Sequence, residues 1–202
     1  FLSIPNVFSQ DGTIDNTFGD NGIVRFGINA HNVSIESTAL QADGKLVVCG
    51  YAFNVTNYSS DFILARFNTD GSFDNTFGNN GIVVTNIGTS ESLSDLAIQA
   101  DGKIVVGGNC PESSSDFVVA RYNTNGNLDD TFGNNGTVMT NFGGNDQCNS
   151  IAIQEDGKII ASGFSVVDGD AKVAVIRYLD NGSLDDSFDQ DGKTVIDGSD
   201  YS

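Results

Sequence analysis

The sequence predicts an all-β protein built from tandem, four-stranded antiparallel blades of a β-propeller. The first observation is a repeated segment, which occurs in four copies at 11–22, 70–81, 125–136 and 181–192. The second is an Asp-Gly-Lys triplet, which recurs in step with it at 43–45, 101–103 and 156–158. The third is the absence of helical periodicity in the short apolar runs between these markers. Two independent markers that keep the same period indicate one supersecondary unit copied along the chain.

The copy at 81–136 shows the expected strands most clearly. Four short apolar or alternating segments fall at 81–85, 96–99, 103–108 and 116–122. Turn signals separate them, notably Ala100-Asp101-Gly102 and Thr124-Asn125-Gly126. In the last segment Phe117, Val119 and Arg121 share one face, as the two-residue period of a strand requires. A parallel β-helix is the competing fold, but Asp-Gly hairpins favour antiparallel neighbours.

The two markers divide the chain into three complete units and two partial ones. We expect the end of a preceding blade at 1–22, blades at 23–80, 81–135 and 136–191, and a further first strand or tail at 192–202. Propellers close with about four to eight blades, so three blades are not expected to close a ring alone. The chain is therefore interpreted as a slice of a longer one, or as a copy that associates with others to complete a ring.

Composition excludes several classes of function. The net charge is -18, and six of the nine Lys and Arg residues occupy repeat positions, which leaves no basic patch for nucleic acid. No apolar run is long enough to insert into a membrane. An acidic surface rich in Asn, Gly, Ser and Thr favours an extracellular or cell-surface protein.

The three cysteines carry little information by number alone. Cys49 lies in an apolar run, and Cys148 aligns with Ile35 and Leu93, so both are interpreted as core residues. The sequence leaves open whether Cys110 and Cys148 form a disulfide.

The repeat also contains one arginine per unit, at positions 66, 121 and 177. We predict that each forms an ion pair with an aspartate of the following connector, at positions 74, 129 and 185, and so joins one blade to the next. A ring of guanidinium groups around an anionic ligand is the alternative. The connector phenylalanines, Phe77, Phe132 and Phe188, are predicted to anchor in the core.

The same connectors are rich in oxygen ligands, which a hard cation such as calcium requires. The candidate calcium ligands are Asp70, Asp74, Asn125, Asp129, Asp180 and Asp185. Asp-Gly and Asn-Gly pairs are equally what a tight turn needs, so turn chemistry is the competing interpretation.

No catalytic group of residues is visible, and the protein is predicted not to be an enzyme. His31 is the only histidine, and the chain contains neither a nucleophile motif nor a phosphate-binding glycine loop. A polysaccharide-acting enzyme stays an alternative, with four glutamates as its candidates: Glu36, Glu91, Glu112 and Glu155.

The repeated pattern resembles the delta-60 repeat. The residues that carry the resemblance are Ala-Ile-Gln-x-Asp-Gly-Lys-Ile-Val-Val-x-Gly, followed by Asp-Phe-x-x-Ala-Arg-Tyr-Asn and the connector, from Asp11 to about Asp197. Local departures are Lys172-Val173 in place of Asp-Phe, and Asp189 in place of glycine. The resemblance implies propeller blades of large secreted or surface proteins without a settled biochemical activity.

Function is expected to reside in loops that differ between units while the framework is retained. These loops lie at 27–35, 52–60, 86–94, 109–115, 141–149 and 164–171. The leading hypothesis is a non-enzymatic structural or interaction module that binds a protein or a glycan. A self-assembling fibre or filament subunit is a further alternative.

Overall fold

The computed structural model describes residues 12–29, 31–88, 90–111, 115–167 and 169–196. Twelve strands occupy these residues. They are β1 (His31–Leu40), β2 (Leu46–Asn54), β3 (Ser59–Phe67), β4 (Ile82–Thr85), β5 (Ser92–Ile98), β6 (Ile104–Pro111), β7 (Ser115–Tyr122), β8 (Thr137–Thr140), β9 (Asn145–Ile153), β10 (Ile159–Val167), β11 (Asp170–Tyr178) and β12 (Lys193–Ile196). Within the described ranges, no helix has the length and apolar character needed to cross a membrane.

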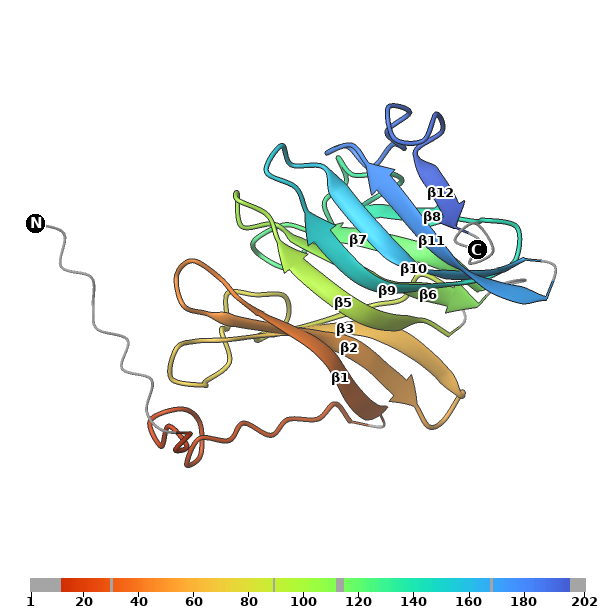
Figure 1. Cartoon of the computed structure of the whole chain (residues 1–202). Helices are drawn as coiled ribbons and strands as arrows, with labels where there is room; N and C mark the ends of the chain where they lie inside the picture. The colour runs from red at the N-terminus through yellow and green to blue at the C-terminus, as the bar shows by residue number, and fades with distance from the viewer. Residues whose placement is uncertain (1–11, 30, 89, 112–114, 168, 197–202) are drawn as a thin grey trace, which may run out of the picture.

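The strands form three four-stranded antiparallel sheets, in the orders β1-β2-β3-β4, β5-β6-β7-β8 and β9-β10-β11-β12. Figure 1 shows the sheets stacked in chain order. The first strands of successive sheets lie beside one another, because β5 contacts β1 and β2, and β9 contacts β5 and β6. The predicted all-β fold of blade-like antiparallel sheets is confirmed.

The sheets are offset from the repeat units that the sequence suggested. The segment 82–85 was expected to open the second blade, but β4 pairs with β3 and completes the first sheet. Likewise β12 pairs with β11 in the third sheet instead of beginning a further blade. The reason is local: the connector turns the chain back, Arg66 N–H donates to the Gly81 carbonyl, and the next strand lies antiparallel to the one just left. Of the segment 1–22, expected to end a preceding blade, residues 1–11 lie outside the described residues.

The Asp-Gly-Lys triplets form the tight turns that the sequence indicated. In the first, the Lys45 N–H donates to Asp43 Oδ1, and Gly44 has a φ of 83°, which favours glycine. Gly102 and Gly157 repeat this conformation, with φ values of 84° each. The turns therefore join β1 to β2, β5 to β6 and β9 to β10 in the same way.

Two apolar cores fill the spaces between the sheets. Phe62, Leu64 and Phe77 of the first sheet unit pack against Ile104 and Tyr122 of the second. The second core repeats this arrangement one blade further along, with the completely buried Phe117, Phe132, Ile159, Ile176 and Tyr178. The prediction that the connector phenylalanines anchor in the core is thus confirmed for Phe77 and Phe132, whereas Phe188 is half-buried.

Each sheet has two chemically different ends. The pairing of Leu46 with both Leu40 and Phe67 places the Asp-Gly-Lys turns and the connectors at one end, which we call the constant end. It comprises residues 41–45, 68–81, 99–103, 123–136, 154–158 and 179–192. The opposite end, which we call the variable end, carries the loops that differ between units, at 54–59, 86–91, 109–115, 141–144 and 167–170. Residues 89, 112–114 and 168 of these loops lie outside the described residues.

The inner strands β1, β5 and β9 are joined by one carboxylate. Asp95 of β5 accepts a hydrogen bond from the Ser37 hydroxyl of β1 at 2.7 Å. Its other oxygen accepts from the Ser150 hydroxyl and the Ile151 N–H of β9, at 3.0 and 2.9 Å. Asp95 follows a bulge in β5, where the pairing with β6 shifts between Leu93 and Asp95. A single side chain therefore links three blades.

All three cysteines are buried and outside any disulfide, so Cys110 and Cys148 do not form the bond left open by the sequence. The core roles expected for Cys49 and Cys148 are confirmed, since both are completely buried. Burial raises the pKa of each of these two thiols to about 12. A thiol held in this state is a poor nucleophile at neutral pH.

We expect a thiol reagent such as Ellman's reagent to leave all three cysteines of the folded protein unmodified and to titrate three thiols after denaturation. The reason is that burial excludes the reagent and, at Cys49 and Cys148, also suppresses the thiolate. Absorbance of the released thionitrobenzoate measures the number. Rapid modification without denaturant, or fewer than three thiols in denaturant, would contradict the expectation.

Candidate functional site

Every blade carries the same ion pair at its constant end, buried in the first two blades and partly exposed at Arg177 in the third. The guanidinium Nε lies 2.8 Å from the aspartate Oδ2 in the pairs Arg66–Asp74 and Arg121–Asp129, and 2.7 Å in Arg177–Asp185. The arginine comes from the third strand of each sheet, and the aspartate from the connector that follows. The ion pairs predicted from the repeat are confirmed.

A lysine and a hydroxyl group complete each ion network. The ammonium group of Lys45 lies 2.9 Å from Asp74 Oδ2, and the same contact measures 3.1 Å for Lys103–Asp129 and 3.2 Å for Lys158–Asp185. The second oxygen of Asp74 accepts hydrogen bonds from the N–H and the hydroxyl of Thr76. Each carboxylate is therefore satisfied by groups of its own blade.

These contacts decide the charge state of the three carboxyl groups. Burial by itself would raise the pKa of Asp74, but hydrogen bonds from Thr76 and Lys45 and the charge of Arg66 outweigh it, so the pKa lies well below its usual range. The same balance lowers the pKa of Asp129. At Asp185 the hydrogen bond from Ser187 is the main cause of the lowered pKa. All three aspartates are ionised at any pH near neutrality.

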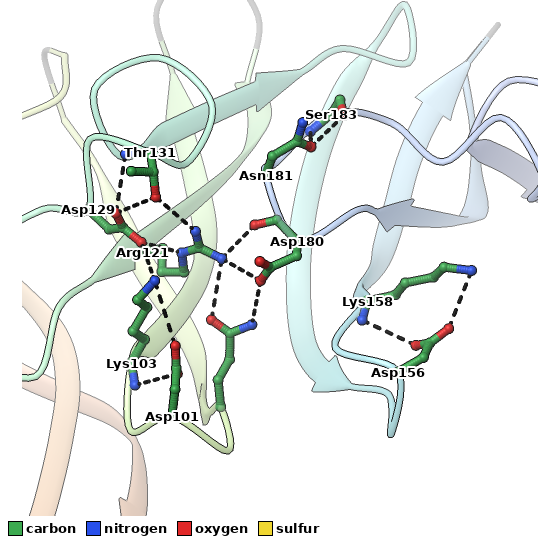
Figure 2. A network of polar contacts seen from close by, with 11 residues as sticks. Asp101, Lys103, Arg121, Asp129, Thr131, Asp156, Lys158, Asp180, Asn181 and Ser183 are labelled. Atoms are coloured by element: carbon green, nitrogen blue, oxygen red, sulfur yellow. Dashed lines mark hydrogen bonds and ion pairs between the residues drawn. The ribbon is translucent and has the colours of Figure 1, made fainter.

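Arg66 and Arg121 also join one blade to the next, but through contacts with the following connector and not through the ion pair with aspartate that the sequence predicted. Arg66 Nη1 donates to the Thr124 carbonyl of the second blade's connector at 2.6 Å. Arg121 Nη1 donates to both the carbonyl and the side chain of Asp180 in the third, at 2.5 and 2.8 Å. Figure 2 shows Arg121 between Asp129 of its own blade and Asp180 of its neighbour.

The connector phenylalanine completes the surroundings of each guanidinium. The Cζ atoms of Arg66, Arg121 and Arg177 lie 4.5, 4.8 and 4.9 Å from the ring centroids of Phe77, Phe132 and Phe188. Such contacts add a cation–π attraction to the ion pair. Each repeated arginine is thus paired with an aspartate and a phenylalanine ring of its own connector, which favours the structural interpretation over a ring of anion-binding groups.

The candidate calcium ligands take part in turns and ion networks. Asp70 Oδ1 accepts from the N–H and hydroxyl of Ser72, and Asn125 Oδ1 accepts from the Asn127 N–H. Within the described residues, no group of three or more His, Cys, Asp or Glu side chains is placed to hold a metal ion. Calcium binding by these connectors stays a prediction without direct support.

Two buried carboxylates at the variable end were not anticipated. Glu91 and Asp146 occupy equivalent positions at or just before the first strand of their sheets and are completely buried. Glu91 accepts from the N–H groups of Ile87 and Gly88, and Asp146 from that of Phe142. One oxygen of each lacks a hydrogen-bond partner. These carboxylates fix the loops that enter the second and third sheets, and their shared repeat position was the signal available in the sequence.

Tyr58 is a second feature that sequence reasoning missed. It lies in the loop between β2 and β3, is 78% exposed, and contacts Phe53 edge to face with ring centroids 6.3 Å apart. Its φ of 59° is a left-handed conformation that bulky residues rarely adopt. An aromatic residue in a polar loop, Asn54 to Ser60, was the only signal for it.

The glutamates considered for catalysis do not share a site. Glu91 is buried and engaged with backbone groups at the variable end, whereas Glu155 is exposed in the β9–β10 turn at the constant end. Glu36 is exposed in β1, where it accepts a hydrogen bond from Ser34. Glu112 lies outside the described residues.

Comparison with known families agrees with this architecture. Residues 41–77, 99–132 and 154–188 match the family described as domain of unknown function (DUF5122) beta-propeller, and together they cover just over half of the chain. Each match runs from an Asp-Gly-Lys turn to a connector phenylalanine. The protein belongs to this β-propeller family. No curated protein matches the chain.

We expect Asp74→Asn to lower the free energy of unfolding by about 3–5 kcal/mol, because it leaves Arg66, only 5% exposed, without its anion. Urea unfolding followed by circular dichroism measures the loss. Asp70→Asn is the matched control, since Asn already occupies this turn position in the other copies, at 125 and 181. Its effect should stay within about 0.5 kcal/mol. Equal losses in the two variants would refute a stabilising role of the ion pair.

The lowered pKa of Asp74 also predicts a dependence on pH. Its carboxylate stabilises the fold fully above the unfolded pKa of about 3.9, and this contribution is lost as the pH falls toward the folded value. The stability difference between the wild type and Asp74→Asn should therefore be constant above about pH 5 and narrow below about pH 4, by about 1.4 kcal/mol per pH unit. Urea midpoints measured across this range test it, and a constant difference down to about pH 2 would contradict it.

Proposed function

We propose that this protein is a non-enzymatic interaction module of an extracellular or cell-surface protein, of the delta-60 repeat type, which binds a protein or glycan ligand through its variable end. The observation that carries the proposal is the division of the sheets into a constant and a variable end. The repeated lysine, arginine and aspartate at the constant end form the same ion pairs in every blade. The loops of the variable end differ in length and sequence on the same framework.

The exposed Tyr58 supports a binding role for the variable end. A tyrosine offers a large rigid surface at a small cost in side-chain entropy, and its hydroxyl adds a polar contact. Its left-handed backbone costs on the order of 1 kcal/mol or more, and strain of this kind clusters at functional sites. Tyr58 is therefore the residue that we place at the centre of the ligand contact.

The buried carboxylates support the same role in a different way. Glu91 and Asp146 hold the loops that precede them by the backbone N–H groups of Ile87, Gly88 and Phe142. Side chains at the exposed positions of these loops are then free to vary without loss of loop geometry. A rigid framework with variable loops is the usual arrangement of binding proteins.

We expect Tyr58→Ala to weaken the binding of an immobilised polysaccharide or surface-protein ligand about tenfold or more, as the loss of a central aromatic contact does. Surface plasmon resonance against a panel of polysaccharides and purified cell-surface proteins measures the binding, with calcium and with a chelator in parallel. Asp70→Asn at the constant end is the control and should bind as the wild type does.

Three results would count against this proposal. Equal binding by Tyr58→Ala and the wild type would move the site away from Tyr58. Release of soluble sugar from a polysaccharide would favour the enzyme alternative. A native mass of several chains that is required for binding would favour the assembly alternative.

A further inference from the structure

The two spaces between successive blades at the constant end are equivalent by repeat but differ in one residue. The first cleft, between the turn 41–45 and the second blade, has a volume of about 580 Å³ and contains Lys45, Arg66 and Gln41 in its lining. The second cleft, between the turn 99–103 and the third blade, has a volume of about 210 Å³ and contains Asp180 in its lining. Asp180 aligns with Thr124 of the first cleft.

In the second cleft the Asp180 carboxylate is held by two donors. Arg121 Nη1 lies 2.8 Å from Asp180 Oδ1, and Gln99 Nε2 lies 3.3 Å from the same oxygen. Figure 2 shows this carboxylate directed at Arg121. The side chain is 74% exposed, so the carboxylate is bound at the mouth of the cleft, where it meets solvent.

The first cleft has the same donors and lacks the carboxylate. Arg66 Nη1 donates to the Thr124 carbonyl and lies 3.5 Å from Gln41 Oε1. Arg121 Nη1 has the equivalent contacts with the Asp180 carbonyl and Gln99 Oε1, and the Asp180 carboxylate in addition. Gln41 Nε2, the equivalent of Gln99 Nε2, reaches only the Gly102 carbonyl, also at 3.5 Å. Thr124 directs its methyl group at the Gly102 turn. Arg66 Nη1 and Gln41 Nε2, the counterparts of the two donors that bind Asp180, are thus present in the first cleft without a carboxylate acceptor.

Compared with the second cleft, the first cleft carries less negative charge that would repel an anion. Its charged lining consists of Lys45 and Arg66 against the rim carboxylates Asp43 and Asp101. The buried Asp74 is already paired with both cations. The second cleft tolerates Asp180 although Asp101 and Glu155 also line it. The first cleft has Ala100 and Thr124 where the second has Glu155 and Asp180, and so carries two fewer negative charges.

We propose that the first inter-blade cleft is a binding site for a carboxylate supplied by a ligand, which occupies the position that Asp180 fills in the second cleft. Arg66 Nη1 and Gln41 Nε2 donate to it, and the Lys45 ammonium adds positive charge. The reference geometry is that of an aspartyl side chain, so the ligand is an acidic side chain of a peptide. The volume lies within the usual range of ligand clefts, about 300–1,000 Å³. This site lies at the opposite end of the sheets from the loops of the proposed function and does not depend on it.

The experiment titrates the full chain with N-acetyl-aspartate N-methylamide and follows the Nε–Hε signals of Arg66 and Arg121 by NMR. The neutral control ligand is N-acetyl-asparagine N-methylamide, and glucuronate tests a sugar acid. We expect a saturable shift of the Arg66 signal with the aspartate ligand, at a dissociation constant of about 1 mM or weaker, and none with the asparagine ligand. A stronger response to glucuronate than to the aspartate ligand would overturn the peptide assignment.

Two reciprocal variants locate the site. Thr124→Asp supplies a tethered carboxylate that competes at high effective concentration, so binding at Arg66 should weaken about tenfold or more. Asp180→Thr opens the second cleft, so the Arg121 signal should now respond to the ligand. Asn181→Asp is the matched control, because it adds the same charge at the equivalent turn position of the third connector, outside the lining of the first cleft, where the first copy has Asp70. It should leave binding at Arg66 within about twofold.

Three results would overturn the proposal. The first is a wild-type Arg66 signal that does not respond to the aspartate ligand. The second is an equal response to the asparagine ligand, since the site would then not recognise charge. The third is undiminished binding by Thr124→Asp while its circular dichroism spectrum remains that of the wild type.

Discussion

The rest of this structure depends on the contacts of one arginine guanidinium group, which each sheet carries on its third strand. Arg66 and Arg121 each contact an aspartate of their own connector, a phenylalanine ring and the carbonyl of the next connector. An arginine that is only 2–5% exposed requires such complete pairing, because an unpaired charge in this position would cost several kcal/mol. One side chain therefore fixes the connector within a blade and the spacing between blades.

This arrangement separates stability from recognition. At the constant end, the charged side chains form ion pairs with one another, and the same lysine, arginine and aspartate recur from blade to blade. At the variable end, buried carboxylates such as Glu91 fix the loops by accepting hydrogen bonds from backbone N–H groups. These bonds do not depend on which side chains the loops expose. The first inter-blade cleft departs from this division, because it has Thr124 where the second cleft has Asp180, which leaves two donors of the constant end incompletely used.

The repeat itself explains which features were predictable. Arg121 and Asp129 occur at a constant separation in every unit, so their contact was inferred without coordinates, and Phe132 followed from the same logic. The pairing of β4 with β3 was not inferred, because a four-residue apolar segment has no sequence property that chooses between two sheets. Asp95 was also missed: its partners, Ser37 and Ser150, are 58 and 55 residues away and belong to different sheets. Tyr58 was missed because its exposure and its left-handed backbone conformation arise only in the folded chain.

The sequence by itself determined the class of fold, the period of the blades and the partners of the buried arginines, because these are properties that repeat along the chain. Tertiary structure decided the boundaries of the sheets, the single carboxylate that joins three inner strands and the difference between the two inter-blade clefts. The physical reason is that hydrogen bonds and ion pairs between distant segments depend on which surfaces the packed sheets bring together. A residue such as Thr124 acquires its significance only beside Arg66 of the neighbouring blade.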